Sequence, residues 1–162
     1  ALTPDDALYQ IPEHLKLVPV DFERGADWFD ALLAAGFDPS LPAVFSFLGV
    51  TLYLRGETNA AILRRIGSLS AGTVLCASFM VPLDLVEPSE RVMRRRTEQG
   101  ARSRGTPFVS FYTPQEFLIA CREAGFSDVR HVSASDLAEL YFKDRSDGLQ
   151  PSSSEEMVIA RV

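Results

Sequence analysis

Apolar residues recur at two spacings along the chain, and their alternation predicts strands interleaved with helices. Short, dense apolar runs typical of strands cover residues 15–22, 42–50, 72–81, 127–134 and 157–162. Helical spacing covers residues 25–40, 57–69 and 113–125. Strands that alternate with helices favour βαβ units, so we predict an α/β fold with a mostly parallel sheet. Only a polar linker and a short helical piece separate the last two strands, so we expect the final strand to be antiparallel.

Two of these segments carry more detailed signals. The run PAVFSFLGV at residues 42–50 is almost uniformly apolar, which predicts a strand buried on both faces. The helix after residue 112 opens with Thr113 as cap, Pro114 at the first helical position and Glu116 in the capping-box position, and Gly125 ends it.

The segment between residues 87 and 105 is rich in arginine and has a poor apolar face. We expect an exposed helix or a mobile flap here. Arg94, Arg95 and Arg96 are interpreted as a solvated face rather than an anion site.

Composition limits the classes of protein that fit. A chain of 162 residues is long enough for one domain with a substantial core, so we predict a single domain over residues 1–162. The net charge of -6 argues against binding to nucleic acid, which needs lysine and arginine to neutralise phosphates. No apolar run reaches the roughly 18 residues of a membrane span, and the first residues do not resemble a signal peptide. We expect a cytoplasmic protein without membrane contact.

Cysteine and histidine do not form a metal-binding pattern. Cys76 and Cys121 each lie in an apolar periodic segment, which predicts buried thiols. His14 and His131 are far apart and lack spaced partners, so no metal site is expected. We interpret His131 as a packed or surface residue rather than a general base.

The candidate binding residues follow two of the predicted strands. Ligands of open α/β sheets bind outside the carboxyl ends of the strands. Asp21 and Phe22 lie at one such end, and Ser46, Phe47, Leu48 and Gly49 lie at another. A carboxylate beside an aromatic ring fits adenine, because the acid accepts hydrogen bonds from the amino group and the ring forms an apolar wall. The alternative is that Asp21 only caps the following helix.

Motifs for phosphate binding and nucleophilic catalysis are absent from the sequence. There is no G-x-G pair, no P-loop and no G-x-S-x-G turn. No catalytic residue can therefore be named. Tyr112 and His131 remain candidates near a substrate, although the neighbouring phenylalanines favour core packing for Tyr112.

The stretch VPVDFERGADWFDALLAAGFDPSLPAVFSFLGVTLYL resembles bacterial S-adenosylmethionine-dependent methyltransferases related to leucine carboxyl methyltransferase. The motifs that carry the resemblance are Val18 to Phe22, Trp28, Ala35 to Asp38, Leu48 with Gly49, and Tyr53 with Leu54. The likeness continues through FYTPQEF, AGFSDV, SDGL and the closing VIARV.

The resemblance implies a cofactor and a place for it. It implies S-adenosyl-L-methionine as cofactor, with Asp21 and Phe22 at the adenosyl group and Ser46–Gly49 near the methionine end. Phe22 replaces the usual leucine. Many family members have a glutamate where this chain has Leu48, so the role of that glutamate in the family is not carried over to this position.

The resemblance also implies that this chain is the C-terminal part of a class I, Rossmann-like methyltransferase fold. The glycine-rich cofactor loop and the ribose-binding acid of the family are not among these 162 residues. In the family the sheet order is 3-2-1-4-5-7-6, so the strand at residues 15–22 would be separated from the others. Exposed strand edges pair with other chains. We therefore expect an absent N-terminal segment, a partner, or exchange with a second copy in a homo-oligomer.

The predicted function is methyl transfer to an oxygen of a small molecule or carboxylate. Such a displacement depends largely on holding the reacting atoms in line, so an obvious catalytic constellation is not required. The alternative is a non-catalytic α/β module that assembles through an exposed sheet edge. A third reading is an α/β domain that binds another adenine-containing ligand.

Overall fold

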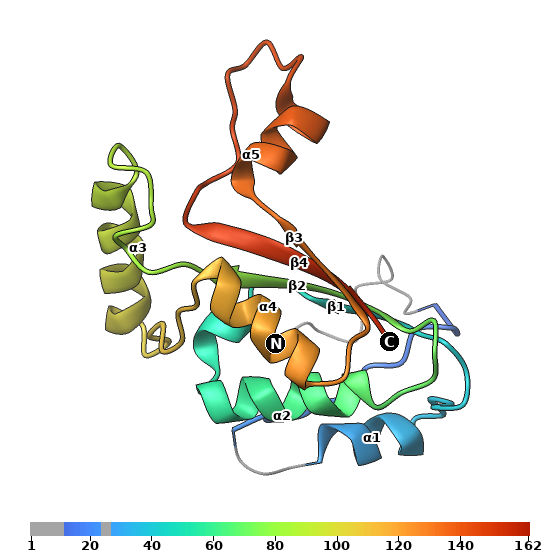
Figure 1. The fold of residues 1–162 in the computed structure, drawn as a ribbon. Helices are drawn as coiled ribbons and strands as arrows, with labels where there is room; N and C mark the ends of the chain where they lie inside the picture. The colour runs from blue at the N-terminus through green and yellow to red at the C-terminus, as the bar shows by residue number, and fades with distance from the viewer. Residues whose placement is uncertain (1–11, 24–26) are drawn as a thin grey trace. The chain divides into compact units, whose positions relative to one another are not determined.

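The computed structural model describes residues 12–23 and 27–162 (Figure 1). The chain divides into two compact units, residues 1–38 and residues 39–162. The prediction that they form one domain stays a prediction. In the smaller unit, helix α1 (Trp28–Ala34) begins at its cap Asp27, whose Oδ1 accepts the backbone N–H groups of Phe29 and Asp30 at 2.9 and 3.3 Å. Gly36 follows the helix with φ 96°, a left-handed conformation that favours glycine.

The strand predicted at residues 15–22 is not formed. None of these residues joins the sheet of the described chain, and the side chain of Leu17 is 69% exposed. A strand needs a neighbour that takes its backbone N–H and C=O groups, and an apolar pattern does not supply one. The prediction that Asp21 lies at the end of a sheet strand is therefore wrong.

The larger unit contains a four-stranded sheet in the order β1-β2-β4-β3. Its strands are β1 (Val44–Phe47), β2 (Val74–Met80), β3 (Asp128–Val132) and β4 (Glu155–Arg161). Strands β1 and β2 are parallel, while β4 lies antiparallel to both of its neighbours. Three strands thus share one direction and the last opposes them, which confirms the predicted α/β class and antiparallel final strand. The order equals the 4-5-7-6 portion of the sheet that the resemblance implied.

Helices α2 (Gly56–Gly67) and α4 (Pro114–Glu123) lie together on one face of this sheet (Figure 1). The ring of Phe79 on β2 stacks on Phe117 of α4 with centroids 4.5 Å apart. A Cβ at Gly67 would come within 2.1 Å of the Ala124 carbonyl oxygen, so only glycine permits this approach of the two helix ends. The capping box of α4 forms as predicted, between Thr113 and Glu116.

Strand β1 is not buried on both faces as predicted. Val44 is 78% exposed and Ser46 is also exposed, whereas Phe47 is buried. Ser46 is in register with Cys76 and points to the same face, and Cys76 is only half-buried. The reason is that β1 is an edge strand of the described sheet and α2 and α4 pack on the other face. The buried thiol predicted at Cys121 is confirmed, and burial raises its pKa to about 12.

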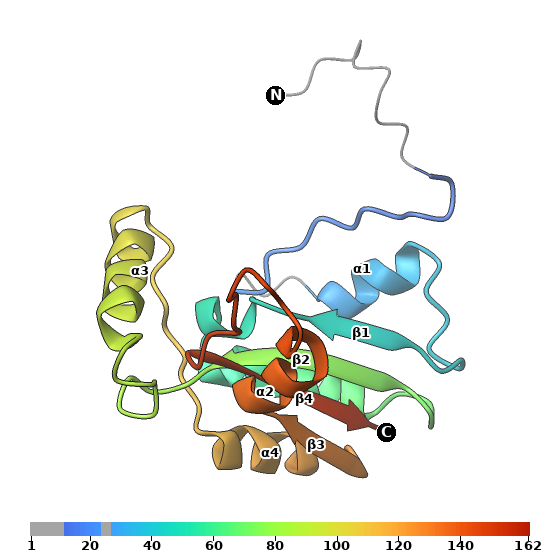
Figure 2. The ribbon, with the colours of Figure 1, turned by 90° about the horizontal axis from the view of Figure 1, so that it is seen from above.

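Four further helical segments complete the larger unit. They are η1 (Thr51–Tyr53), α3 (Arg91–Ser103), α5 (Ala134–Leu137) and η2 (Ala138–Phe142). Seen from above, α3 stands apart from α2 and α4 on the side of the sheet where β2 ends (Figure 2). Of the two alternatives predicted for the arginine-rich segment, a helix or a mobile flap, the structure contains the helix.

Candidate functional site

The carboxyl edge of the sheet is defined here by residues 48–50, 81–90 and 133–138, which follow or lie close after β1, β2 and β3, and by residues 150–155. The last group belongs to the same edge because β4 is antiparallel and begins where the other strands end. Ligands of open α/β sheets bind at this edge.

A buried hydrogen-bond network joins three elements at this edge. The hydroxyl of Ser78 on β2 donates to Oε1 of Glu155 at 2.5 Å and accepts the backbone N–H of Gly49 at 2.7 Å. The Thr51 hydroxyl donates to the Ser78 carbonyl at 2.7 Å, and both residues are buried. Gly49 has φ 66°, which favours glycine in this turn. The turn after β1 is therefore fixed by the Ser78 side chain of β2, which in turn is held by Glu155 of β4.

The loop before β4 is held by a second set of contacts. Oε2 of Glu90 accepts the Ser152 hydroxyl at 2.6 Å and the Ser153 backbone N–H at 3.1 Å. The Ser153 hydroxyl accepts the Glu87 backbone N–H at 2.9 Å. These contacts tie residues 150–154 to the start of α3.

Two of the cavities at this edge are lined in part by this loop. One of about 400 Å³ is lined by residues of β2, α3 and the loop, including Met80, Met93, Arg94, Pro151 and Glu155. Another of about 290 Å³ is lined by Leu48, Ser78, Leu137, Pro151, Ser152, Glu155 and Met157. Pro151, Ser152 and Glu155 line both. Volumes of this size suit small-molecule ligands.

Arg94 is not part of a solvated face, and that prediction is wrong for this residue. Arg94 is only 4% exposed, whereas Arg95 and Arg96 are exposed as expected. Its guanidinium contacts the carboxylate of Glu98 and lies over the rings of Phe108 and Phe111, 5.5 and 5.2 Å from their centroids. Cation–π contacts and the ion pair compensate the charge, while burial lowers the pKa of Arg94 from its usual value.

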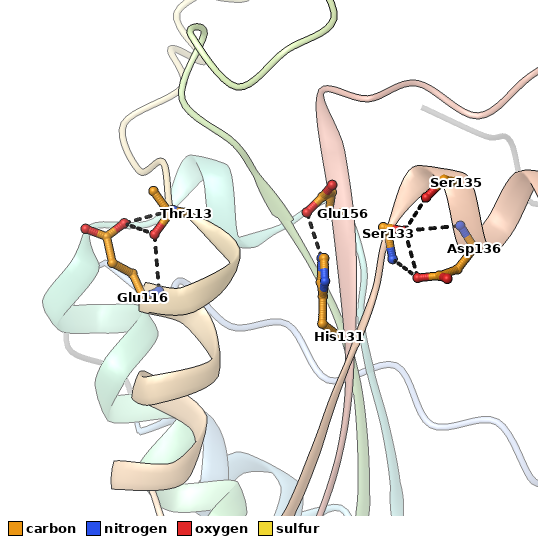
Figure 3. A network of polar contacts seen from close by, with 7 residues as sticks. All are labelled: Thr113, Glu116, His131, Ser133, Ser135, Asp136 and Glu156. Atoms are coloured by element: carbon orange, nitrogen blue, oxygen red, sulfur yellow. Dashed lines mark hydrogen bonds and ion pairs between the residues drawn. The ribbon is translucent and has the colours of Figure 1, made fainter.

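His131 lies inside β3 and contacts Glu156 on β4, with 2.7 Å between Nε2 and Oε2 (Figure 3). The side chains of both residues are half-buried. The same view contains the capping boxes of Thr113 with Glu116 and of Ser133 with Asp136. This position agrees with the interpretation of His131 as a packed residue. Tyr112 is also packed, since its ring lies 5.2 Å from that of Phe117 and its hydroxyl accepts an N–H of Asn59 at 3.1 Å.

The predicted cofactor residues fall in both units. Asp21 is exposed, and its Oδ1 accepts the backbone N–H of Glu23 at 3.0 Å in a local turn. The helix cap is Asp27, so the alternative that Asp21 caps this helix is wrong. Phe22 has its ring 6.4 Å from that of Trp28. Ser46 and Phe47 close β1, and Leu48 and Gly49 form the turn after it. That these groups converge on one adenosyl ligand stays a prediction.

Sequence reasoning missed Ser78, Arg94 and Glu155. Ser78 lies in the middle of an apolar run, where a serine gives no separate signal. Glu155 could have been found, because a carboxylate at the start of an antiparallel final strand must lie at the carboxyl edge of the parallel ones.

Across residues 12–23 and 27–162, no three His, Cys, Asp or Glu side chains gather closely enough to hold a metal ion. The helices in these ranges are all too short or too polar to span a bilayer.

Comparison with known proteins identifies related sequences. The family "Leucine carboxyl methyltransferase" matches residues 5–67. A Bacillus subtilis protein named "Putative S-adenosyl-L-methionine-dependent methyltransferase YktD" is 30% identical over 146 residues, covering 89% of this chain and 47% of that protein. A similarly named protein of Mycolicibacterium paratuberculosis is also 30% identical over 146 residues, covering 83% of this chain and 46% of its own length.

A solved structure supports the fold. The crystal structure of a DUF574 family protein from Streptomyces avermitilis superposes with a TM-score of 0.54 and 18% identity, covering 81% of this chain and 50% of that one. The chain spans about half the length of these relatives. By its sequence, the chain is thus a relative of bacterial proteins named as S-adenosyl-L-methionine-dependent methyltransferases, and it is related over residues 5–67 to the leucine carboxyl methyltransferase family.

Proposed function

We propose that this chain is the C-terminal part of an S-adenosyl-L-methionine-dependent methyltransferase that methylates an oxygen of a small molecule or a carboxylate. The observation that carries the proposal is the pair of cavities at the carboxyl edge of a sheet with the family's strand order. The names of the relatives supply the cofactor and the reaction type.

The residues at this edge fit part of such a cofactor. Leu48 is partly exposed and lines the cavity of about 290 Å³, where it offers an apolar wall. The backbone N–H of Gly49 is already engaged by Ser78, so it positions the turn and does not bind a ligand. In the smaller unit, the exposed Asp21 carboxylate would accept the adenine amino group, with Phe22 beside it.

The bound cofactor would supply an electrophilic methyl group on a sulfonium. The role of this chain is to hold the acceptor oxygen in line with that methyl group and to exclude water, which can contribute much of the rate. The network of Ser78, Glu155 and Gly49 suits this role, because it joins β2 and β4 to the turn after β1, beside the cavity of about 290 Å³.

An assembly role without catalysis is the second candidate. It is favoured by β1, which is an edge strand of the described sheet with Val44 exposed to solvent. Such an edge can pair with a second copy, with a partner, or with a preceding segment of a longer gene product. The intact mass of the natural protein and its mass in solution separate these arrangements.

Titration calorimetry with S-adenosyl-L-methionine and S-adenosyl-L-homocysteine tests the proposal on this chain and on the natural gene product. We expect binding, and we expect Asp21→Ala to weaken it by roughly tenfold, the effect of one lost hydrogen bond to a charged group. Glu13→Ala is the matched control, because Glu13 is also an exposed acid of the same segment. No heat from the natural gene product, together with self-association, would support the assembly role.

A further inference from the structure

The cavity of about 400 Å³ at the end of β2 contains three ionisable side chains on largely apolar walls. Met80, Met93 and Pro151 supply apolar surface, while Glu90, Arg94 and Glu155 supply charge. Thioether side chains pack well against aromatic rings. The walls therefore suit a small aromatic ligand, and the charges decide which polar group it carries.

Arg94 is poorly placed to bind a ligand carboxylate. Its guanidinium already contacts Glu98 and lies over Phe108 and Phe111. Its Nε is buried and has no hydrogen-bond partner among residues 12–23 and 27–162, but its charge is compensated by the Glu98 carboxylate. An anion entering the cavity would have to compete with that carboxylate.

The two glutamates differ in how fully they are engaged. Glu90 accepts hydrogen bonds from Ser152 and Ser153 and holds the loop. Glu155 accepts one hydrogen bond, from Ser78 to Oε1, and its Oε2 has no partner within the described ranges. With Arg94 paired to Glu98, the remaining charge of the cavity is negative, which disfavours a carboxylate ligand and favours a hydrogen-bond donor.

We propose that this cavity holds a neutral hydroxyl acceptor, a phenol or similar alcohol, and that Glu155 accepts its proton. This inference rests on the proposed function and narrows its substrate class by excluding carboxylate acceptors. During transfer, a lone pair of the acceptor oxygen forms the new bond to the methyl carbon as the methyl–sulfur bond breaks, and the sulfur keeps that electron pair. The O–H bond breaks and the proton passes to Oε2 of Glu155, which later releases it to water. A sulfonium and a carboxylate thus become a neutral thioether and a carboxylic acid, so atoms and charge balance.

The methionines allow a test that needs no cofactor. The chain has three, of which Met80 and Met93 line this cavity and Met157 lines the neighbouring one. Chains labelled with ¹³C at the methionine methyl groups are titrated with p-cresol and with 4-methylbenzoate, which share a methyl-substituted ring and differ in the polar group. We expect p-cresol to shift the Met80 and Met93 resonances and to bind at least about tenfold more tightly than 4-methylbenzoate.

Variants of Glu155 decide whether its charge carries the preference. Glu155→Gln keeps an oxygen for the Ser78 hydroxyl and is expected to retain the fold, which circular dichroism and urea unfolding of the variant check. We expect it to weaken p-cresol binding about tenfold and to reduce the discrimination against 4-methylbenzoate. Glu123→Gln, at an exposed site on α4, removes the same charge elsewhere and leaves binding unchanged. Should Glu155→Gln perturb the fold, Glu155→Asp retains the charge and is expected to retain the discrimination.

Each contrary outcome overturns this inference without deciding the proposed function. Tighter or equal binding of 4-methylbenzoate would assign the cavity to anions and the Nε of Arg94 to their recognition. Unchanged p-cresol binding in Glu155→Gln would show that Glu155 does not recognise the acceptor. The absence of shifts at Met80 and Met93 would show that p-cresol does not bind in this cavity. Cofactor calorimetry tests the methyltransferase assignment separately, so a chain that binds the cofactor but not p-cresol refutes the acceptor class alone.

Discussion

Two apolar runs, LKLVPVDF at residues 15–22 and PAVFSFLGV at residues 42–50, have similar composition and different structures. The second forms β1 and pairs in register with β2, while the first forms no strand in the described chain. Pro19 has no N–H to give to a neighbour, and Leu17 stays exposed. The difference teaches that the apolar pattern marks candidate strands, whereas a pairing partner decides which of them form.

The same difference separates the two groups of predicted binding residues. The turn at Leu48 and Gly49 is fixed by Ser78, which in turn contacts Glu155 on β4. Asp21 accepts the backbone N–H of Glu23, two residues further along the same segment. The binding group after β1 is therefore held in place by a neighbouring strand, whereas Asp21 lies on a segment that forms no strand in the described chain.

The largest expected effect compares one side chain from each run. Phe47→Ala removes a buried ring from β1 and should lower the free energy of unfolding by about 3–5 kcal/mol. Leu17→Ala removes an exposed side chain and should change it by less than about 0.5 kcal/mol. Urea unfolding followed by circular dichroism measures both. A loss at Leu17 comparable to that at Phe47 would mean that the first run does pack in solution.

A smaller effect is expected from the contacts that hold the turn after β1. Ser78→Ala leaves the Gly49 N–H without its acceptor and Glu155 Oε1 without its donor, so unfolding should become easier by about 1–3 kcal/mol. Ser68→Ala removes an exposed hydroxyl that contacts only a local carbonyl and serves as the control. If both serine variants were equally stable, the turn would be held by its backbone alone.

The smallest effects concern the two capping boxes, which extend the comparison to helices. Thr113→Ala should cost about 1 kcal/mol, because α4 carries the buried Phe117 and Cys121. Ser133→Ala should cost less in global unfolding, since α5 contains no buried residue among its four. Equal losses in the free energy of unfolding would show that the capping hydrogen bonds themselves set the contribution to stability, and not the number of buried residues in the capped helix.

The cap of α4 also predicts a pH dependence. Hydrogen bonds from the Thr113 backbone N–H and then its hydroxyl lower the pKa of Glu116 below its ordinary 4.5. A depressed folded-state pKa stabilises the fold above the unfolded value, and this contribution is lost as the pH falls through the lowered value. The stability difference between the native chain and Glu116→Gln should therefore shrink from about pH 6 to about pH 3 in the same urea measurement. A difference that stayed constant over this range would exclude the Glu116 carboxylate as its source.

Prediction from sequence succeeded where local signals coincide with burial. The capping box at Thr113, the glycine stop at Gly125, and the apolar faces of α2 and α4 all lie where the pattern put them. Prediction failed for Arg94, which the composition of residues 87–105 placed on a solvent-exposed face. Its burial depends on Phe108 and Phe111, which lie more than ten residues away and whose position follows from the path of the chain after α3.

For this protein, the sequence by itself determined helices α1, α2 and α4, four of the five predicted strands, the antiparallel final strand and the family resemblance, because these depend on short-range periodicity, caps and motifs. Only the tertiary structure decided that residues 15–22 form no strand in the described chain, that Arg94 is buried, and that Ser78 and Glu155 meet at 2.5 Å beside the cavity of about 290 Å³. Those outcomes depend on which distant residues fill a hydrogen bond or cover a surface, and that information is spread over the whole fold.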